Sequence, residues 1–338
     1  MRNDLKYFSY CLLLIINCTL EFMRLLLILT SIFLFNVSVA NTADYKNLDK
    51  LSKSNSFFDE KGNPYSIEKI QDIKNSILII YNHGSENDLK IDPCNKKPQK
   101  GYLWKGAVVP ALLKLHDKKI NNLTVKIYRL CSGVKGISLK TMKKYRKELN
   151  ETGSIVLQDE YKNLRRQNII INEVKKFKDL GFENIILAGY SAGAWASLNL
   201  QARFPELIEG VIAINPAFAG KKSGWQKKYP EWGKIREKEI DTLSRNKNLK
   251  AILFAHNKDK FEDVKTLSFF KNFKEINFID YSNIKPNSCS WADVNRNMES
   301  DKGHNIPQSK CFTKYVEKNE YFSKFLEKTF RDRGSGFK

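Results

Sequence analysis

The sequence has few of the residues that most often build metal centres. It holds four histidines and six cysteines in 338 residues, with no Cys-x-x-Cys pair and no cluster of histidines. This pattern excludes the usual zinc sites, so we expect neither a metal nor any other cofactor. Acid–base chemistry at a histidine would have to use one of the four, which are His83, His116, His256 and His304.

The sequence also lacks a hydrophobic run long enough to cross a membrane. Its two apolar runs, the longer at 25–35, fall short of the roughly 20 residues that a spanning helix needs. The longer run follows a basic start at Met23-Arg24 and precedes small residues at Ser38 and Ala40, the pattern of a cleaved signal peptide. We therefore expect residues 1–40 to be a signal peptide, and the mature protein to be periplasmic or secreted without a stable membrane span. Because two apolar runs in tandem are unusual, we interpret Met23 as the true start, and an uncleaved membrane anchor is the alternative.

Acidic residues are in the minority, but this imbalance indicates no particular partner. Lysine and arginine number 58 against 37 aspartates and glutamates, a net charge of +21. The lysines are spread along the chain without a basic run or a stripe interleaved with aromatics, so we expect no specific nucleic-acid site and only loose attraction to anionic surfaces. The sequence shows no internal repeat or low-complexity linker, which favours a single domain after the signal peptide.

What the sequence does contain is an alternation of strand and helix patterns. Apolar runs of strand length alternate with segments in which apolar residues recur near helical spacing. The predicted strands are 76–81, 123–130, 184–190, 210–214, 250–255 and 276–281, and the predicted helices are 110–116, 159–180, 192–204, 261–273 and 312–331. The remaining segments are an N-terminal arm at 41–75, a basic helix or loop at 139–150, an irregular insertion at 217–247, a loop at 282–310 and a tail at 332–338. The alternation predicts an α/β fold, a mostly parallel central sheet with helices on both faces, whose active residues lie at the carboxyl ends of the strands.

One stretch carries a recognisable catalytic pattern. Gly189-Tyr-Ser-Ala-Gly193 has the form G-x-S-x-G, and it stands between the predicted strand at 184–190 and the predicted helix at 192–204. Strand, G-x-S-x-G and helix are the context of a nucleophile elbow, in which a serine on a sharp turn exposes its hydroxyl. The alternative is a glycine-lined turn in which the serine only caps the helix.

Further polar residues follow other predicted strands. His83-Gly84-Ser85 comes after the strand at 76–81, and Asp259 comes after the strand at 250–255. His304 lies in the loop after the last strand. The order Ser191, Asp259, His304, with a His-Gly turn upstream, resembles that of the α/β-hydrolase superfamily, within which the stretch around Asp259 looks like the acid turn of dienelactone-hydrolase-like and esterase members.

This resemblance covers roughly residues 76–330 and implies a serine-hydrolase mechanism. Ser191 would attack a carbonyl, His304 would act as the base, and Asp259 would orient the imidazole. The N–H groups of Ala192 and of Gly84 or Ser85 would bind the oxyanion. The sequence departs from the superfamily in two respects: no antiparallel strands are evident before the His-Gly strand, and the acid turn lacks its common glycine.

Two assignments at this site have alternatives. Asp263 is the second candidate for the acid. His256, which ends a strand beside Asp259, is the second candidate for the base. We interpret His83 as a residue that stabilises its turn rather than a proton shuttle.

The resemblance also bears on the insertion and the cysteines. Residues 217–247 stand where the superfamily often carries a lid, and their aromatic residues would either line a pocket or pack on the domain. Cys94, Cys131, Cys289 and Cys311 follow the signal peptide, and in an oxidising compartment they form two disulfides. Since the strands at 76–81 and 123–130 are neighbours in this superfamily, we predict Cys94–Cys131, and Cys289–Cys311 would then close the loop that carries His304.

The sequence thus predicts an exported serine hydrolase that cleaves carboxylic esters on a small-molecule ester or acyl substrate. A serine peptidase or a thioesterase of the same fold is one alternative, because the fold does not choose the substrate. A non-catalytic protein that binds a ligand or partner in the same crevice is another.

Overall fold

The structure is a computed structural model that describes residues 55–84, 108–132, 139–152, 162–218, 230–246, 248–290 and 303–331. The predicted signal peptide, Ser85, Cys94, Trp225, Tyr229 and the tail at 332–338 lie outside these residues.

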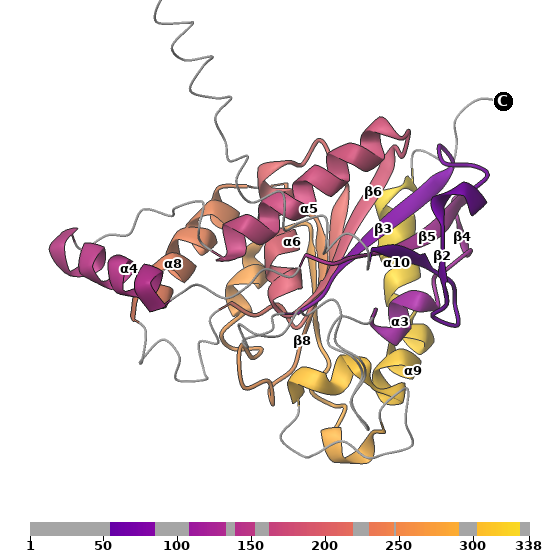
Figure 1. The fold of residues 1–338 in the computed structure, drawn as a ribbon. Coiled ribbons are helices and arrows are strands. Elements are labelled where there is room, and N and C mark those ends of the chain that lie inside the picture. The colour runs from indigo at the N-terminus through magenta and orange to yellow at the C-terminus, as the bar shows by residue number, and fades with distance from the viewer. Residues whose placement is uncertain are drawn as a thin grey trace, which may run out of the picture. The chain divides into compact units, whose positions relative to one another are not determined.

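The described residues form one nine-stranded, open sheet (Figure 1). Its strands are β1 (Ser56–Phe58), β2 (Pro64–Tyr65), β3 (Ser76–Asn82), β4 (Lys119–Ile120), β5 (Leu123–Leu130), β6 (Asn184–Tyr190), β7 (Gly210–Ile214), β8 (Ala251–Ala255) and β9 (Ile276–Asp280). They lie in the order β2-β1-β5-β3-β6-β7-β8-β9, with β4 paired to β5. The strands from β5 to β9 along this order are parallel, whereas β1, β2 and β4 pair antiparallel. The predicted fold class, a mostly parallel α/β sheet, is confirmed.

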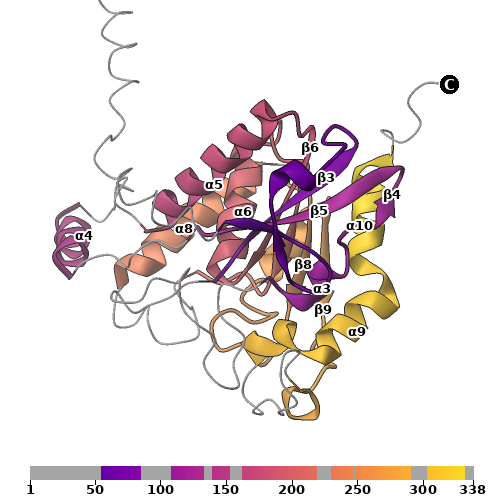
Figure 2. The same cartoon turned by 45° about the vertical axis from the view of Figure 1, so that its right-hand side comes forward.

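Helices cover both faces of the sheet, as Figures 1 and 2 show from two directions. The helices are α3 (Pro110–Leu113), α4 (Leu139–Thr152), α5 (Lys162–Asp179), α6 (Ala192–Arg203), α8 (Pro230–Arg245), α9 (Lys310–Asn319) and α10 (Tyr321–Thr329). One core cluster joins α5, α6 and α8 to one face, and the other joins α3, α9 and α10 to the opposite face. Alternate residues of β3 enter the two clusters, Leu78 the first and Ile79 the second, which is why the central strands are apolar throughout.

The register of the parallel strands brings their carboxyl ends to a single edge. Asn82 at the end of β3 pairs with Gly189 of β6, and Tyr190 at the end of β6 pairs with Ile214 of β7. Further along, the end of β8 pairs with Asp280 of β9. The loops that carry the candidate site residues therefore leave the sheet side by side.

Four predictions of local structure were wrong. Residues 261–273 form turns and a short 3-10 helix (Ser268–Asn272) rather than an α-helix, and the side chains of Asp259 and Asp263 accept backbone N–H groups in these turns. The insertion at 217–247 is not irregular throughout, since 230–245 is helix α8. The predicted helix at 312–331 is two helices, separated at Glu320, whose φ is 54°. The short antiparallel strands β1, β2 and β4 were missed.

Helix α8 packs on the domain through buried polar contacts as well as apolar ones. The Arg236 guanidinium donates to both carboxylate oxygens of Glu262, at 2.9 and 3.1 Å. Glu239 accepts hydrogen bonds from the Asn163 amide of α5 and the indole N–H of Trp195 in α6. This half of the predicted lid segment therefore packs down on the sheet-covering helices.

Candidate active site

Ser191 stands at the turn between β6 and α6. Its backbone has φ 56° and ψ −123°, a conformation that residues other than glycine adopt only under strain. Its N–H donates to the carbonyl of Ile214 at 3.0 Å, and its carbonyl accepts from the N–H of Ala217 at 3.2 Å. The side chain is half-buried. A strained serine between a buried strand and a helix is the geometry of a nucleophile elbow.

The two glycines of G-x-S-x-G are required by close packing. A Cβ on Gly189 would lie 2.4 Å from the nitrogen of Ala194, and a Cβ on Gly193 would lie 2.2 Å from the carbonyl oxygen of Asn82. No side chain fits at such distances. The close approach of Gly193 to Asn82 also places the start of α6 against the end of β3.

Two candidate oxyanion donors lie beside Ser191. Ala192 is the first residue of α6, so the helix supplies no acceptor for its N–H. Gly84 follows β3, and a Cβ built on it would lie 3.2 Å from the Cβ of Ser191. The third candidate, Ser85, lies outside the described residues.

Asp259 and His304 are joined by a hydrogen bond. The Nδ1 atom of His304 lies 2.5 Å from Oδ2 of Asp259, and both side chains are buried. The other carboxylate oxygen of Asp259 accepts from the N–H groups of Phe261, at 2.8 Å, and Glu262, at 3.3 Å. The carboxylate is thus held from both sides, and it can fix one tautomer of the imidazole, with the proton on Nδ1.

Close backbone packing brings His304 to Asp259. A Cβ on Gly303 would lie 2.5 Å from the carbonyl carbon of Lys258 and 2.8 Å from the nitrogen of Asp259. Only glycine permits the two loops to approach this closely. The glycine at position 303 therefore allows His304 to lie against the turn that carries Asp259.

Two further side chains hold the main chain of His304. The hydroxyl of Tyr190 donates to the His304 carbonyl at 2.7 Å, and the amide of Asn215 donates to the same oxygen at 3.0 Å. Asn215, whose φ is 44°, accepts in turn from the hydroxyl of Tyr281 at 2.6 Å. Because Tyr190 ends β6 and Asn215 follows β7, the candidate base His304 is anchored to the ends of these two strands. The hydroxyl of Ser191 makes no hydrogen bond to His304 among the described residues, and such contacts are often long before substrate binds.

The alternative candidates for the base and the acid, His256 and Asp263, form hydrogen bonds with other groups. Nε2 of His256 lies 2.9 Å from the carbonyl of Ile284, and its Nδ1 accepts from the N–H of Lys258 at 3.0 Å. Burial lowers the pKa of His256, which matches a neutral imidazole bound to backbone on both nitrogens. Asp263 accepts from the N–H of Thr266 at 2.8 Å, in a local turn.

His83 and His116 also have structural partners. Nδ1 of His83 lies 2.6 Å from the carbonyl oxygen of Gly84, which can only accept, so Nδ1 carries the proton. The ring is buried, as expected of a residue that stabilises its turn. Nε2 of His116 lies 3.1 Å from the hydroxyl of Tyr65, beside β2.

The disulfide across the last loop is present. Cys289 and Cys311 are bonded, with their Cα atoms 5.6 Å apart, which confirms that prediction. Cys131 is also disulfide-bonded, and its partner lies outside the described residues, as does Cys94.

The sequence did not identify three residues that the structure brings to this site. Tyr190 is an unspecified position of G-x-S-x-G, and Asn215 follows the predicted strand at 210–214. Arg166 lies on the buried face of α5 and donates to the carbonyl of His83 at 2.6 Å. The sequence does carry a signal for Arg166. The buried face of α5 continues with the polar residues Asn163, Arg166 and Gln167, and polar residues on an inward face are unusual.

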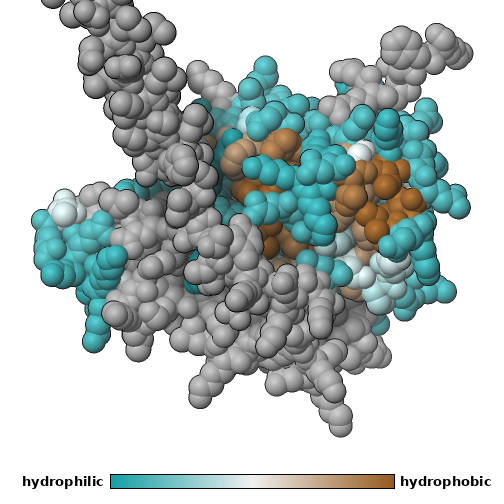
Figure 3. Space-filling view, turned by 45° about the horizontal axis from the view of Figure 1, so that its top comes forward, coloured by the Kyte–Doolittle hydropathy of each residue, from teal (hydrophilic) through white to brown (hydrophobic). Residues whose placement is uncertain are grey.

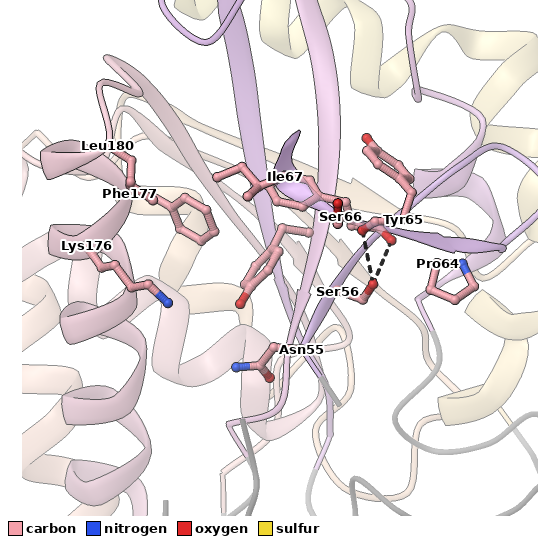
Figure 4. Close-up of a pocket in the computed structure, with 11 residues that line it drawn as sticks. Asn55, Ser56, Pro64, Tyr65, Ser66, Ile67, Lys176, Phe177 and Leu180 are labelled. Carbon is pink, nitrogen blue, oxygen red and sulfur yellow. Dashed lines mark hydrogen bonds between the residues drawn. The ribbon is translucent and has the colours of Figure 1, made fainter. Parts of the chain in front are cut away.

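A hollow of about 490 Å³ lies elsewhere, between α5 and the β1–β2 hairpin (Figure 4). Its wall includes Phe57, Tyr65, Ile67, Lys176, Phe177 and Leu180. Leu180 is 47% exposed and is the one large apolar side chain so exposed among the described residues. Figure 3 shows a face on which apolar side chains gather in patches among hydrophilic ones. Since no acid or histidine is among the described residues that line the hollow, these residues offer no general base, and the hollow is not the candidate active site.

The described part of the chain holds neither a metal-binding cluster nor a helix that could span a membrane. No group of three or more histidine, cysteine or acidic side chains there could hold a metal ion. No helix there is both long and apolar enough to cross a membrane.

The chain is similar in fold to solved structures, and the comparisons found no protein of closely similar sequence. No family model and no curated protein matches the sequence. Among solved structures, Est1E from Butyrivibrio proteoclasticus is 13% identical with a TM-score of 0.43, over 80% of this chain and 92% of that chain. A putative dipeptidyl aminopeptidase IV from Bacteroides ovatus is 13% identical with a TM-score of 0.48, over 81% of this chain and 35% of that chain. An esterase from Pyrococcus furiosus is 14% identical with a TM-score of 0.39, over 76% of this chain and 84% of that chain. These similar structures are esterases and peptidases of the α/β-hydrolase superfamily.

Proposed function

We propose that the chain is an exported serine hydrolase that cleaves carboxylic esters through Ser191, His304 and Asp259. The observation that carries this proposal is the bond between His304 and Asp259, formed at the sheet edge where Ser191 occupies a strained elbow. A histidine with an oriented tautomer and a serine on a strained elbow at the same sheet edge are the groups that acyl transfer needs.

The reaction would proceed in two steps. His304 takes the hydroxyl proton as Ser191 attacks the ester carbonyl, and it then protonates the departing alcohol. Asp259 keeps Nδ1 protonated and stabilises the imidazolium. The N–H groups of Ala192 and of Gly84 or Ser85 bind the oxyanion, and water releases the acid from the acyl-enzyme by the same route.

Substrate class is tested by a panel of chromogenic substrates. Short-chain p-nitrophenyl esters, acyl thioesters and aminoacyl p-nitroanilides are compared at equal concentration, with Ser191→Ala as the control. The proposal predicts that the esters have the highest kcat/KM and that Ser191→Ala abolishes their turnover. Faster cleavage of the anilides would make the protein a peptidase, faster cleavage of the thioesters a thioesterase, and no Ser191-dependent turnover would leave a binding protein.

Export is tested separately from catalysis. We propose cleavage after Ala40, so the mature protein begins at Asn41, and a disulfide such as Cys289–Cys311 suits an oxidising compartment. N-terminal sequencing of exported protein should begin at Asn41. A sequence beginning before Met23 would contradict this part of the proposal.

A further inference from the structure

Arg166 is a buried cation beside the candidate oxyanion loop. It lies on α5 and is 1% exposed, and its partners are main-chain oxygens rather than a carboxylate. Arg236, another buried arginine of this layer, is by contrast paired with Glu262. Burial lowers the pKa of Arg166 to about 10, so the guanidinium stays charged at neutral pH. A buried charge without a counterion destabilises the fold, which points to a functional reason for keeping it.

The two oxygens that Arg166 binds belong to consecutive peptide groups. Nη1 donates to the carbonyl of His83 at 2.6 Å, and Nη2 lies 3.5 Å from the carbonyl of Gly84. The Gly84 oxygen also accepts from Nδ1 of His83 at 2.6 Å. The side chain of Arg166 thus contacts both carbonyl groups of the turn that follows β3.

The geometry of the peptide bond links the His83 carbonyl to a candidate oxyanion donor. In a planar trans peptide, the C=O of one residue and the N–H of the next point in opposite directions. The carbonyl of His83 therefore fixes the N–H of Gly84, which points away from Arg166. Gly84 lies close to the elbow, since a Cβ built on it would be 3.2 Å from the Cβ of Ser191.

We propose that Arg166 is a positioning residue that orients and polarises the peptide N–H of Gly84, a candidate donor of the oxyanion hole. A charged donor on a carbonyl draws electron density through the peptide and makes the N–H at its other end a stronger donor. Arg166 does not touch the substrate; it acts through the His83–Gly84 turn. The inference rests on the proposed function, because it concerns the step in which charge develops on the substrate oxygen.

Three variants separate the guanidinium charge from its hydrogen bonds. Arg166→Met removes both, and Arg166→Gln keeps an N–H donor for the His83 carbonyl without the charge. Arg203→Met is the matched control, because Arg203 lies on α6 and donates to Gln167 of α5 at 2.9 Å, away from the turn. The readouts are kcat and KM for p-nitrophenyl acetate, the inhibition constant of phenylboronic acid, which forms a tetrahedral adduct, and the melting temperature.

The expected result is a lower kcat together with weaker binding of the boronic acid. Direct removal of one oxyanion donor lowers the rate by about 10²–10³, so an indirect effect of at least about tenfold is expected for Arg166→Met, with KM nearly unchanged. Arg166→Gln should lie between that variant and the wild type, and Arg203→Met should keep the wild-type kcat. Phenylboronic acid should bind the Arg166 variants more weakly in the same ratio.

Other outcomes overturn the inference, and they are distinguishable from failure of the proposed function. If Arg166→Gln folds with the wild-type melting temperature and keeps kcat and boronic acid affinity, the inference is wrong, even if Arg166→Met does not fold. An equal loss in Arg203→Met would show a purely structural effect. A wild type that neither hydrolyses the ester nor reacts with a fluorophosphonate would overturn the proposed function, and this inference with it.

Discussion

The hydroxyl of Tyr190 donates a hydrogen bond to the main-chain carbonyl of His304 at 2.7 Å, and the two rings pack with their centroids 5.0 Å apart. The residue before the proposed nucleophile thus holds the proposed base. Tyr190→Phe keeps the ring contact and removes the bond, which contributes about 1 kcal/mol, so kcat for p-nitrophenyl acetate should fall about fivefold.

The matched control for this variant is Tyr128→Phe. Tyr128 is also buried, and its hydroxyl donates to Glu173 on α5, away from His304. The control should change the melting temperature and leave kcat unaltered. Equal kcat in Tyr190→Phe and the wild type would show that the bond does not position His304.

Gly303→Ala should separate His304 from Asp259. The added Cβ would lie 2.5 Å from the carbonyl carbon of Lys258, so one of the two loops has to move. A displacement of about 1 Å can lower the rate by about 10²-fold, and we expect a loss in kcat of that size. Steady-state kinetics with p-nitrophenyl acetate measures it.

Gly181→Ala is the control for a glycine substitution. Gly181 has φ 98° and follows the end of α5, where the one described residue that an added Cβ would meet is Ile73, at 3.8 Å. This variant should lose stability through backbone strain and keep its activity. If Gly303→Ala behaved in the same way, the packing of Gly303 would have no part in catalysis.

The Cys289–Cys311 disulfide should support the position of His304, which lies between the two cysteines in sequence. The bond closes a sequence separation of 22 residues, and on the chain-entropy model it stabilises the fold by about 3 kcal/mol. Cys289→Ser combined with Cys311→Ser should lower kcat more than it disturbs the fold at about 25 °C, as judged by kinetics beside circular dichroism. Full activity in the double variant would mean that the disulfide stabilises the loop without affecting the base.

Glu239 should make stability depend on pH. Burial raises its pKa from 4.5 to about 7, although hydrogen bonds from Asn163 and Trp195 act in the opposite direction. Between pH 4.5 and about 7 the folded state keeps a proton that the unfolded state releases, so this contribution to stability is lost as pH rises through that window. The loss corresponds to roughly 3 kcal/mol.

Urea unfolding of the wild type and of Glu239→Gln at a series of pH values measures this contribution. The variant has no ionisable group at this position, so the stability of the wild type relative to the variant should fall between pH 4.5 and about 7. The lowered pKa values of His116 and His256 act in the other direction but equally in both proteins, and they cancel in the difference. Parallel curves would contradict the raised pKa.

The sequence was informative where a pattern is local and uninformative where a contact is tertiary. The apolar run that became β6 and the glycines on either side of Ser191 can be recognised because strand and elbow impose them directly on neighbouring residues. The two residues of β2 are too few to carry an alternation, and they form a strand only because β1 pairs beside them. The spacing along α5 marks Arg166 as a buried polar residue, but the roles of Arg166 and Asn215 depend on carbonyl groups that the fold brings from distant segments.

Two local exceptions lie at single turns of the chain. Residues 261–273 form turns and a short 3-10 helix, in which Asp259 and Asp263 accept backbone N–H groups locally. At Glu320 the chain adopts φ 54°, which ends α9 although the apolar pattern continues into α10. A side-chain hydrogen bond or a backbone angle at a single residue can end a helix. The periodic pattern of apolar residues does not show where this happens.

The central claim is that Ser191 is a nucleophile activated by His304, and reaction with a fluorophosphonate tests it most directly. Intact-protein and peptide mass spectrometry should show one adduct per chain, located on Ser191, and none on Ser191→Ala. His304→Ala should react far more slowly than the wild type while it remains folded. A wild type that does not react, or an adduct that persists in Ser191→Ala, would contradict the claim.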